Sequence, residues 1–212
     1  MDHPGQITAA GVAAQEILEQ KHAAREITLS ASRRAIRSCA TAIRAVHRRD
    51  FQEAVSLIAV AAAYLAEAEV ALAGHADVRY AGFLNDAKKE FAEANLTLAF
   101  VSGHPLPTAG ELGVDVQPYL NGMAEAASEL RRQVLDCLRG DERGEAERLL
   151  ALMDDVYGML VTIDYPDALT GGLRRSTDAL RAVLERTRGD VTTAIVAARL
   201  QAAVERRTPA GG

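Results

Sequence analysis

The sequence predicts an all-α protein, and three observations lead to that prediction. Of its 212 residues, 49% are hydrophobic but only 4% are aromatic, and Trp is absent. Ala, Leu, Glu and Arg, which favour helices over strands, dominate the composition. Long stretches keep apolar residues at a period of 3.6, and five of the six Pro residues lie outside those stretches. We therefore expect one domain over residues 1–212, a bundle of about six to seven long antiparallel helices.

The first expected helix is the longest, from about Thr8 to Arg49, because this stretch contains no Pro and a single Gly near its start. Its apolar residues keep helical spacing, which predicts one long helix or two nearly collinear ones: Ile17, Ile27, Ile36, Cys39, Ile43 and Val46. Asp50 is a suitable N-cap for the second helix, with Glu53 three residues later as a capping-box partner. This second helix is expected to reach Gly74, and its alanine-rich middle suits close packing against a neighbour.

The second half of the chain continues the same pattern. We expect further helices at about residues 76–102, 116–140, 141–162 and 170–204. Pro105, Pro107 and two nearby glycines mark the clearest break in the chain, a loop between the third and fourth helices. Pro166 ends the fifth helical pattern. Residues from about 207 to 212 are expected to form a frayed tail.

Several classes of protein are disfavoured by composition and motifs. No stretch of about 18 apolar residues lacks charges, and the start lacks a basic region followed by an apolar one, so we expect neither a membrane span nor a secretory signal. Cys39 and Cys137 fall on apolar helix faces, as core residues of a cytoplasmic protein do. Glycine-rich phosphate loops, nucleophilic triads and Cys/His zinc patterns are absent from the sequence. The formal net charge of −5 argues against general affinity for nucleic acid, although a local basic patch remains compatible with it.

Two pairs of carboxylates lie beside apolar helix faces. Glu90 and Glu93 are three residues apart in the third helix, so they share nearly one face, and Asp86 lies one turn before Glu90. Glu125 and Glu129 form a second pair, four residues apart in the fourth helix. Like charges at these spacings destabilise a helix, which favours a bound cation.

These four carboxylates can converge if the third and fourth helices are antiparallel neighbours. Carboxylate oxygens are the ligands that Mg²⁺ and Mn²⁺ prefer, and such a metal can activate water at a phosphodiester. The alternative is a solvated helix surface in which Lys89 pairs with Glu93 and Glu129 pairs with Arg132. A di-iron bundle would need two Glu-x-x-His motifs, and only Glu19–His22 fits that pattern.

Arginines line one face of the first helix, and this face is well separated from the apolar face around the helix axis. Arg33, Arg37, Arg44 and Arg48 occupy positions i, i+4, i+11 and i+15, and Arg34, His47 and Arg49 broaden the stripe. Few acidic residues interrupt this region between Glu26 and Asp50. We interpret the stripe as a surface for nucleic-acid phosphates, with an ordinary solvated face as the alternative.

The sequence resembles the translin and translin-associated factor X (TRAX) family over most of its length. Residues 33–49 look like the family's first helix, and Glu90–Ala94 is similar to the Glu-Tyr-x-Glu-Ala of TRAX-like members. Tyr119–Leu130 is similar to their Tyr-Leu-x-Gly-x-x-Asp-x-x-Gly-Glu-Leu. Leu173-Arg174-Arg175, Asp178 and the later Thr187–Asp190 look like the closing helix of prokaryotic relatives.

The resemblance implies a fold of about seven helices, assembled as a homo-hexamer or homo-octamer into a shell around nucleic acid. In the TRAX-like branch it implies metal-dependent cleavage of single-stranded RNA, with catalysis carried by the acids that match Glu90, Glu93, Glu125 and Glu129. The translin branch binds RNA and DNA without the full set of acids. This chain departs from the pattern in two places, because Glu125 stands where Asp is usual and Ser128 where Gly is usual.

Three functions follow as hypotheses. The first is a homo-oligomeric, Mg²⁺- or Mn²⁺-dependent endoribonuclease in which the arginine stripe holds the RNA backbone. The second is a non-catalytic scaffold for single-stranded RNA or DNA, of the translin type. The third is a helical bundle whose long first helix serves only to form the oligomer.

Overall fold

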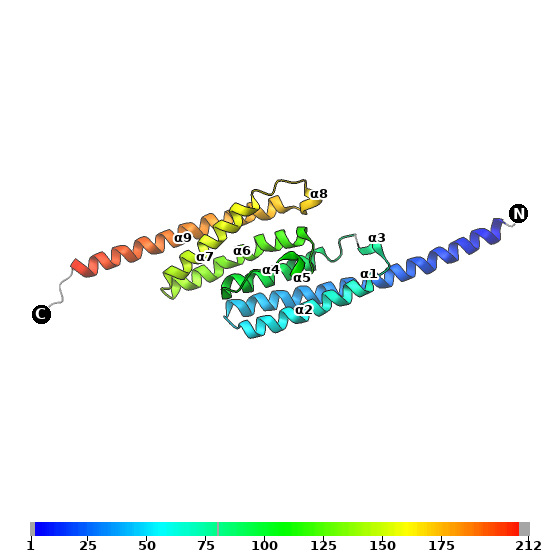
Figure 1. Cartoon of the computed structure of the whole chain (residues 1–212), viewed down its shortest axis with the longest axis horizontal. Helices are drawn as coiled ribbons and strands as arrows, with labels where there is room; N and C mark the ends of the chain where they lie inside the picture. Colours follow the sequence, from blue (N-terminus) through cyan, green and yellow to red (C-terminus); the bar gives the residue numbers. More distant parts are fainter. Residues whose placement is uncertain (1–2, 80, 208–212) are drawn as a thin grey trace.

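The computed structural model describes residues 3–79 and 81–207, and the described residues form helices without strands (Figure 1). Six helices have 18 or more residues: α1 (His3–His47), α2 (Phe51–Ala71), α4 (Asn85–Ser102), α6 (Val116–Arg139), α7 (Arg143–Leu160) and α9 (Leu173–Arg207). Three helices are single turns: α3 (Ala76–Arg79), α5 (Ala109–Leu112) and α8 (Asp167–Thr170). The all-α bundle predicted from the sequence is confirmed.

The long helices pack in a row that runs from α2 through α1, α4 and α6 to α7 and α9. The short connections after α1 and α6 make α1–α2 and α6–α7 antiparallel hairpins. In contrast, α4 and α6 run in the same direction: Lys88 near the start of α4 pairs with Asp115 just before α6, and Lys89 pairs with Glu125 further along. The antiparallel arrangement expected for these two helices is therefore wrong. The cause is the connection over residues 103–115, which carries the chain back along α4 before α6 begins.

Local sequence signals set some of the helix ends. Asp50 caps α2 as predicted, and its side chain accepts a hydrogen bond of 3.0 Å from the backbone N–H of Glu53. The capping box expected with Glu53 is not formed, because the Glu53 carboxylate pairs with Arg48. The single helix expected over residues 76–102 is wrong, because the structure breaks it into α3 and α4. The chain turns between them at Gly82, whose φ of +86° is a left-handed conformation that favours glycine.

The core contains many alanines, which lets the helix backbones approach closely. Leu96, Leu130 and Leu149 are fully buried where α4, α6 and α7 meet, and Cys39 and Cys137 are buried free thiols as expected. By length and composition alone, α2 is apolar enough to cross a membrane, although it carries the charged residues Glu53, Glu67 and Glu69. Its Ile58, Ala61, Leu65 and Ala68 belong to the same core, so the helix is an integral part of the bundle.

The two longest helices project beyond the bundle at opposite ends, as Figure 1 shows. No residue of α1 before Ala24 is buried, and no described residue of α9 after Val191 is buried. Large apolar side chains are nevertheless exposed on both projections: Ile7, Ile17 and Leu18 on α1, and Val196, Leu200 and Val204 on α9.

Candidate metal centre

The candidate site lies where α4 and α6 come into closest contact, at Gly122 of α6. A Cβ atom at this glycine would lie 2.6 Å from the carbonyl oxygen of Lys89 and 3.0 Å from the Cβ of Ala92, which leaves no room for a side chain. Gly122 therefore allows the two backbones to touch. This contact brings the α4 turn that contains Glu90 and Glu93 against the α6 turn that contains Glu125.

Three of the four predicted acids come together at this contact. Glu90, Glu93 and Glu125 each offer a carboxylate oxygen, and the three oxygens lie within 4.8 Å of one another. Glu93 is buried, whereas Glu90 and Glu125 are half-buried. One Mg²⁺ with ligands at about 2.1 Å needs these oxygens within about 4.2 Å of one another, so small side-chain rotations suffice. The donor set consists of carboxylate oxygens, which suits a hard divalent cation such as Mg²⁺ or Mn²⁺.

The fourth predicted acid, Glu129, lies beside this cluster but has a partner from α1. Its carboxylate lies 2.7 Å from Nε2 of His47, whose side chain is only 3% exposed. The Nδ1 atom of His47 is buried and has no hydrogen-bond partner among the described residues. The His47 contact thus fixes Glu129 against α1, next to the three grouped carboxylates.

Lys89 supplies the positive charge nearest to the cluster. Its Nζ lies 2.7 Å from a carboxylate oxygen of Glu125 and 3.6 Å from one of Glu90. The local pairs of the alternative interpretation, Lys89 with Glu93 and Glu129 with Arg132, are not formed. Lys89 contacts Glu125 of α6 instead, and Glu129 contacts His47 of α1.

The carboxylates of the cluster repel one another, which favours either a proton on Glu93 or a bound cation. Burial, together with the charges of Glu90, Glu125 and Glu129, raises the pKa of Glu93 to about 8, and the smaller opposing effect of Lys89 does not prevent this. Burial also raises the pKa of Glu90 above its ordinary value. Behind the cluster, burial and the charges of Glu90 and Glu93 raise the pKa of the Cys39 thiol to about 12, so this cysteine stays a neutral thiol. A divalent cation would remove the repulsion that keeps a proton on Glu93.

The arginine stripe is mostly exposed, as a phosphate-binding surface requires. Arg33, Arg37 and Arg44 are exposed and have no ion pair within the described residues. Arg48 is also exposed and pairs with Glu53. Arg34 differs from these four: it pairs with Glu67 at 2.6 Å and its guanidinium lies 4.5 Å from the centre of the Tyr64 ring, so it ties α1 to α2.

One residue counted with the arginine stripe, His47, contacts the carboxylates. His47 lies three residues beyond Arg44, on the same stripe of α1, and its side chain reaches Glu129. The contacts of His47 and Lys89 with these acids were not predicted, because nothing in the sequence states which residues of separate helices will touch.

Comparison with known proteins supports the family resemblance. The chain is 32% identical over 183 residues to an uncharacterised protein of Methanocaldococcus jannaschii, and the match covers 84% of this chain and 79% of that protein. Among solved structures, AfC3PO in a complex with duplex RNA is 32% identical with a TM-score of 0.80, and the match covers 87% of this chain and 96% of that one. A second crystal structure of AfC3PO gives 31% identity and the same TM-score.

A more distant structure shares the fold alone. Apo-NeC3PO is 18% identical with a TM-score of 0.73, and the match covers 92% of this chain and 98% of that one. A scan against protein-family profiles finds no match. The identity to AfC3PO and the extent of both alignments show that this chain belongs to the translin/TRAX-like family that includes the archaeal and bacterial C3PO proteins.

Proposed function

We propose that this protein is a metal-dependent endoribonuclease that cleaves single-stranded RNA within a homo-oligomeric shell. The observation that carries the proposal is the meeting of Glu90, Glu93 and Glu125, whose ligand oxygens lie within 4.8 Å of one another. Membership of the C3PO family supports RNA as the substrate, since AfC3PO has been crystallised with duplex RNA. The preference for single strands rests on the resemblance to the TRAX-like branch.

In this proposal the four acids have two different roles at the cation. Glu90, Glu93 and Glu125 hold Mg²⁺ or Mn²⁺, and Glu129 completes the acidic wall in the orientation that His47 gives it. When bound, such a cation supplies a hydroxide nucleophile near neutral pH and neutralises charge on the phosphodiester. The exposed arginines Arg33, Arg37, Arg44 and Arg48, with Arg34 beside them, hold the phosphates of the strand.

The proposed homo-oligomer is supported by the two projecting helix ends. Exposed apolar residues such as Ile7 and Leu18 on α1, and Leu200 on α9, are typical of surfaces that pack against another protein. A second copy of the chain can cover them, as a hexamer or octamer requires. The mass of the assembly in solution, measured by light scattering, decides between these sizes and a monomer.

One observation favours a second function, a non-catalytic RNA scaffold of the translin type. Lys89 already supplies a positive charge to Glu125 and Glu90, so the cluster is partly neutralised without any metal. Glu125, which stands where the family usually has Asp, lies 2.7 Å from Lys89.

The test is a cleavage assay with labelled single-stranded RNA in Mg²⁺ and in excess chelator. The proposal predicts cleavage in Mg²⁺ alone, and loss of at least about 100-fold in rate for Glu93→Gln, since cation-based stabilisation of this kind contributes several kcal/mol. Glu147→Gln, which changes an exposed carboxylate outside the cluster, should retain the rate. RNA binding without Mg²⁺-dependent cleavage would support the scaffold instead.

A further inference from the structure

A cavity of about 300 Å³ opens directly beside the carboxylate cluster. It shares Lys89 and Glu125 with the cluster, and its other walls come from the starts of α4, α6 and α9. Arg175, on the first turn of α9, supplies the second cationic side chain of the cavity, Asp86 supplies a second carboxylate besides Glu125, and Asn85 and Gln117 supply side-chain amides. A group held in this cavity would therefore lie next to any cation held by Glu125.

The wall formed by α9 is fixed firmly to α6. The buried side chain of Asn121 donates to the carbonyl of Thr170 at 2.8 Å and accepts from the hydroxyl of Ser176 at 2.7 Å. Gly171 has a φ of +59°, and a Cβ atom there would lie 1.9 Å from the Gln117 amide nitrogen. The backbone before α9 is thus pressed against α6, which positions the first turn of α9 and Arg175 at the cavity.

Three polar side chains of this cavity have donors or acceptors that are not used within the described residues. Arg175 is exposed and forms no ion pair within residues 3–79 and 81–207, and the side-chain amides of Asn85 and Gln117 form no hydrogen bond there. Lys89 is held by Glu125 and Glu90. A divalent cation bound to those carboxylates would compete with the ammonium of Lys89 for them, which would free it to serve the cavity.

We propose that this cavity binds the nucleotide next to the scissile phosphodiester, with Arg175 on a backbone phosphate of that nucleotide. This inference rests on the proposed function, because it takes the carboxylate cluster as the place of cleavage. Guanidinium groups bind phosphates through paired hydrogen bonds, and Lys89 adds a second positive charge on the opposite wall. Asn85 and Gln117 carry the donors and acceptors that a ribose hydroxyl or a base edge needs.

The experiment measures binding of a fluorescent single-stranded RNA to the full chain in excess chelator, where no cleavage interferes. Arg175→Gln should weaken the affinity several-fold and should lower the slope of log Kd against log salt by about one, as expected for one lost phosphate contact. Arg175→Lys, which keeps the charge, should restore most of the affinity.

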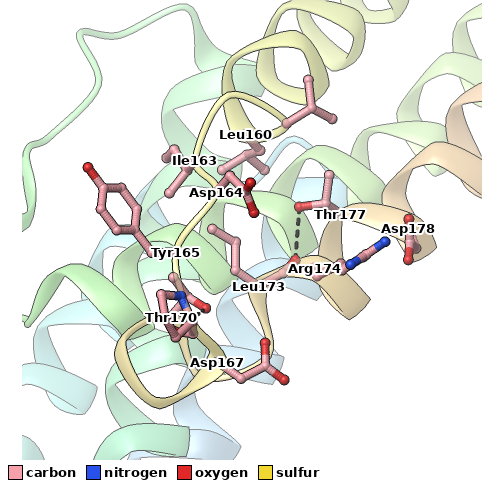
Figure 2. Close-up of a pocket in the computed structure, with 12 residues that line it drawn as sticks. Leu160, Ile163, Asp164, Tyr165, Asp167, Thr170, Leu173, Arg174, Thr177 and Asp178 are labelled. Atoms are coloured by element: carbon pink, nitrogen blue, oxygen red, sulfur yellow. Dashed lines mark hydrogen bonds between the residues drawn. The ribbon is translucent and has the colours of Figure 1, made fainter.

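Arg174→Gln is the matched control. Arg174 is the neighbouring exposed arginine, and Figure 2 shows it in a different cavity, with Leu160 of α7 and Asp178 of α9. Unchanged affinity in Arg175→Gln, or an equal loss in both variants, would overturn the proposal, since the second result reports only the loss of a surface charge.

Failure of this inference and failure of the proposed function give different results. If Glu93→Gln cleaves RNA at the wild-type rate, the metal-dependent mechanism is wrong, whatever the binding data show. If Arg175→Gln binds RNA like the wild-type protein while Glu93→Gln is inactive, the nuclease stands and the subsite is wrong. In Mg²⁺, the subsite predicts a raised KM for Arg175→Gln at short substrates.

Discussion

At the residue scale, the burial of Glu93 among other acids is the feature with the strongest physical consequence. In the unfolded chain this carboxyl would have its ordinary pKa near 4.5, whereas in the folded protein burial raises that pKa to about 8. Between these two values the folded state binds more protons than the unfolded state. The free energy of unfolding of the metal-free protein therefore falls as the pH rises from about 4.5 to 8.

Glu93→Gln should remove this dependence, because the amide never ionises. In excess chelator, we expect the Tm of the variant to exceed that of the wild-type protein at pH 9 by more than it does at pH 5. The difference should widen by at least about 2–4 °C, the shift that 1 kcal/mol produces in a chain of this size. Thermal melts across this pH range measure it, with Glu147→Gln as the control. Parallel curves for wild type and Glu93→Gln would contradict the assignment.

At this scale, relations between residues of the same helix could be predicted from the sequence. The three-residue spacing of Glu90 and Glu93 predicted that they share a face, and the structure places both in the cluster. The partners of these acids, Lys89 across to Glu125 and His47 to Glu129, depend on how separate helices meet. No local pattern contains that information, and the local ion pairs of the solvated-surface alternative are not formed.

At the element scale, the contact of α4 with α6 at Gly122 is what brings the acids together. Gly122→Ala would place a methyl group 2.6 Å from the Lys89 carbonyl oxygen, so the helices must separate. We expect a loss of about 1–3 kcal/mol in the free energy of unfolding, as for other overpacked contacts, together with weaker cation binding. Chemical denaturation measures the first effect and Mn²⁺ titration the second.

Gly158→Ala provides the comparison for this variant. Gly158 lies on the exposed side of α7 and has no atom within 4 Å of an added Cβ, so alanine there should stabilise the protein by about 0.5–1 kcal/mol. If both alanine variants change stability in the same direction, the close contact at Gly122 does not set the spacing of α4 and α6.

The helices themselves were largely predictable, because their apolar period and their caps are local properties. The break between α3 and α4 was missed, since one glycine at position 82 is a weak signal until its left-handed conformation is known. The direction of α4 relative to α6 was also missed, because it depends on the path of residues 103–115 over the surface of the bundle.

At the scale of the whole molecule, α1 presents a row of exposed arginines although the formal net charge is −5. The overall acidity therefore hides a basic surface on α1, as local charge patterning allowed. The projecting ends of α1 and α9 could not have been predicted from periodicity, which marks apolar faces but does not say which of them lack a partner within the chain.

Charge reversal tests the basic surface. Arg37→Glu with Arg44→Glu should weaken RNA affinity at least about tenfold near physiological salt and flatten its salt dependence, because two phosphate contacts become repulsions. Arg181→Glu with Arg186→Glu on α9 changes the net charge equally and should have a smaller effect. Fluorescence anisotropy over a salt series measures both. An equal loss in the two double variants would assign the effect to net charge and not to the stripe.

The most direct test of the account is a Mn²⁺ titration of the full chain, followed by electron paramagnetic resonance. We predict that the wild-type protein binds Mn²⁺ more tightly as the pH rises toward 8, since Glu93 must lose its proton to become a ligand. The variant with Glu90, Glu93 and Glu125 all changed to Gln should lose this binding, while Glu147→Gln retains it. Equal Mn²⁺ affinity in the wild-type protein and the triple variant would contradict the claim that these three carboxylates form the metal site.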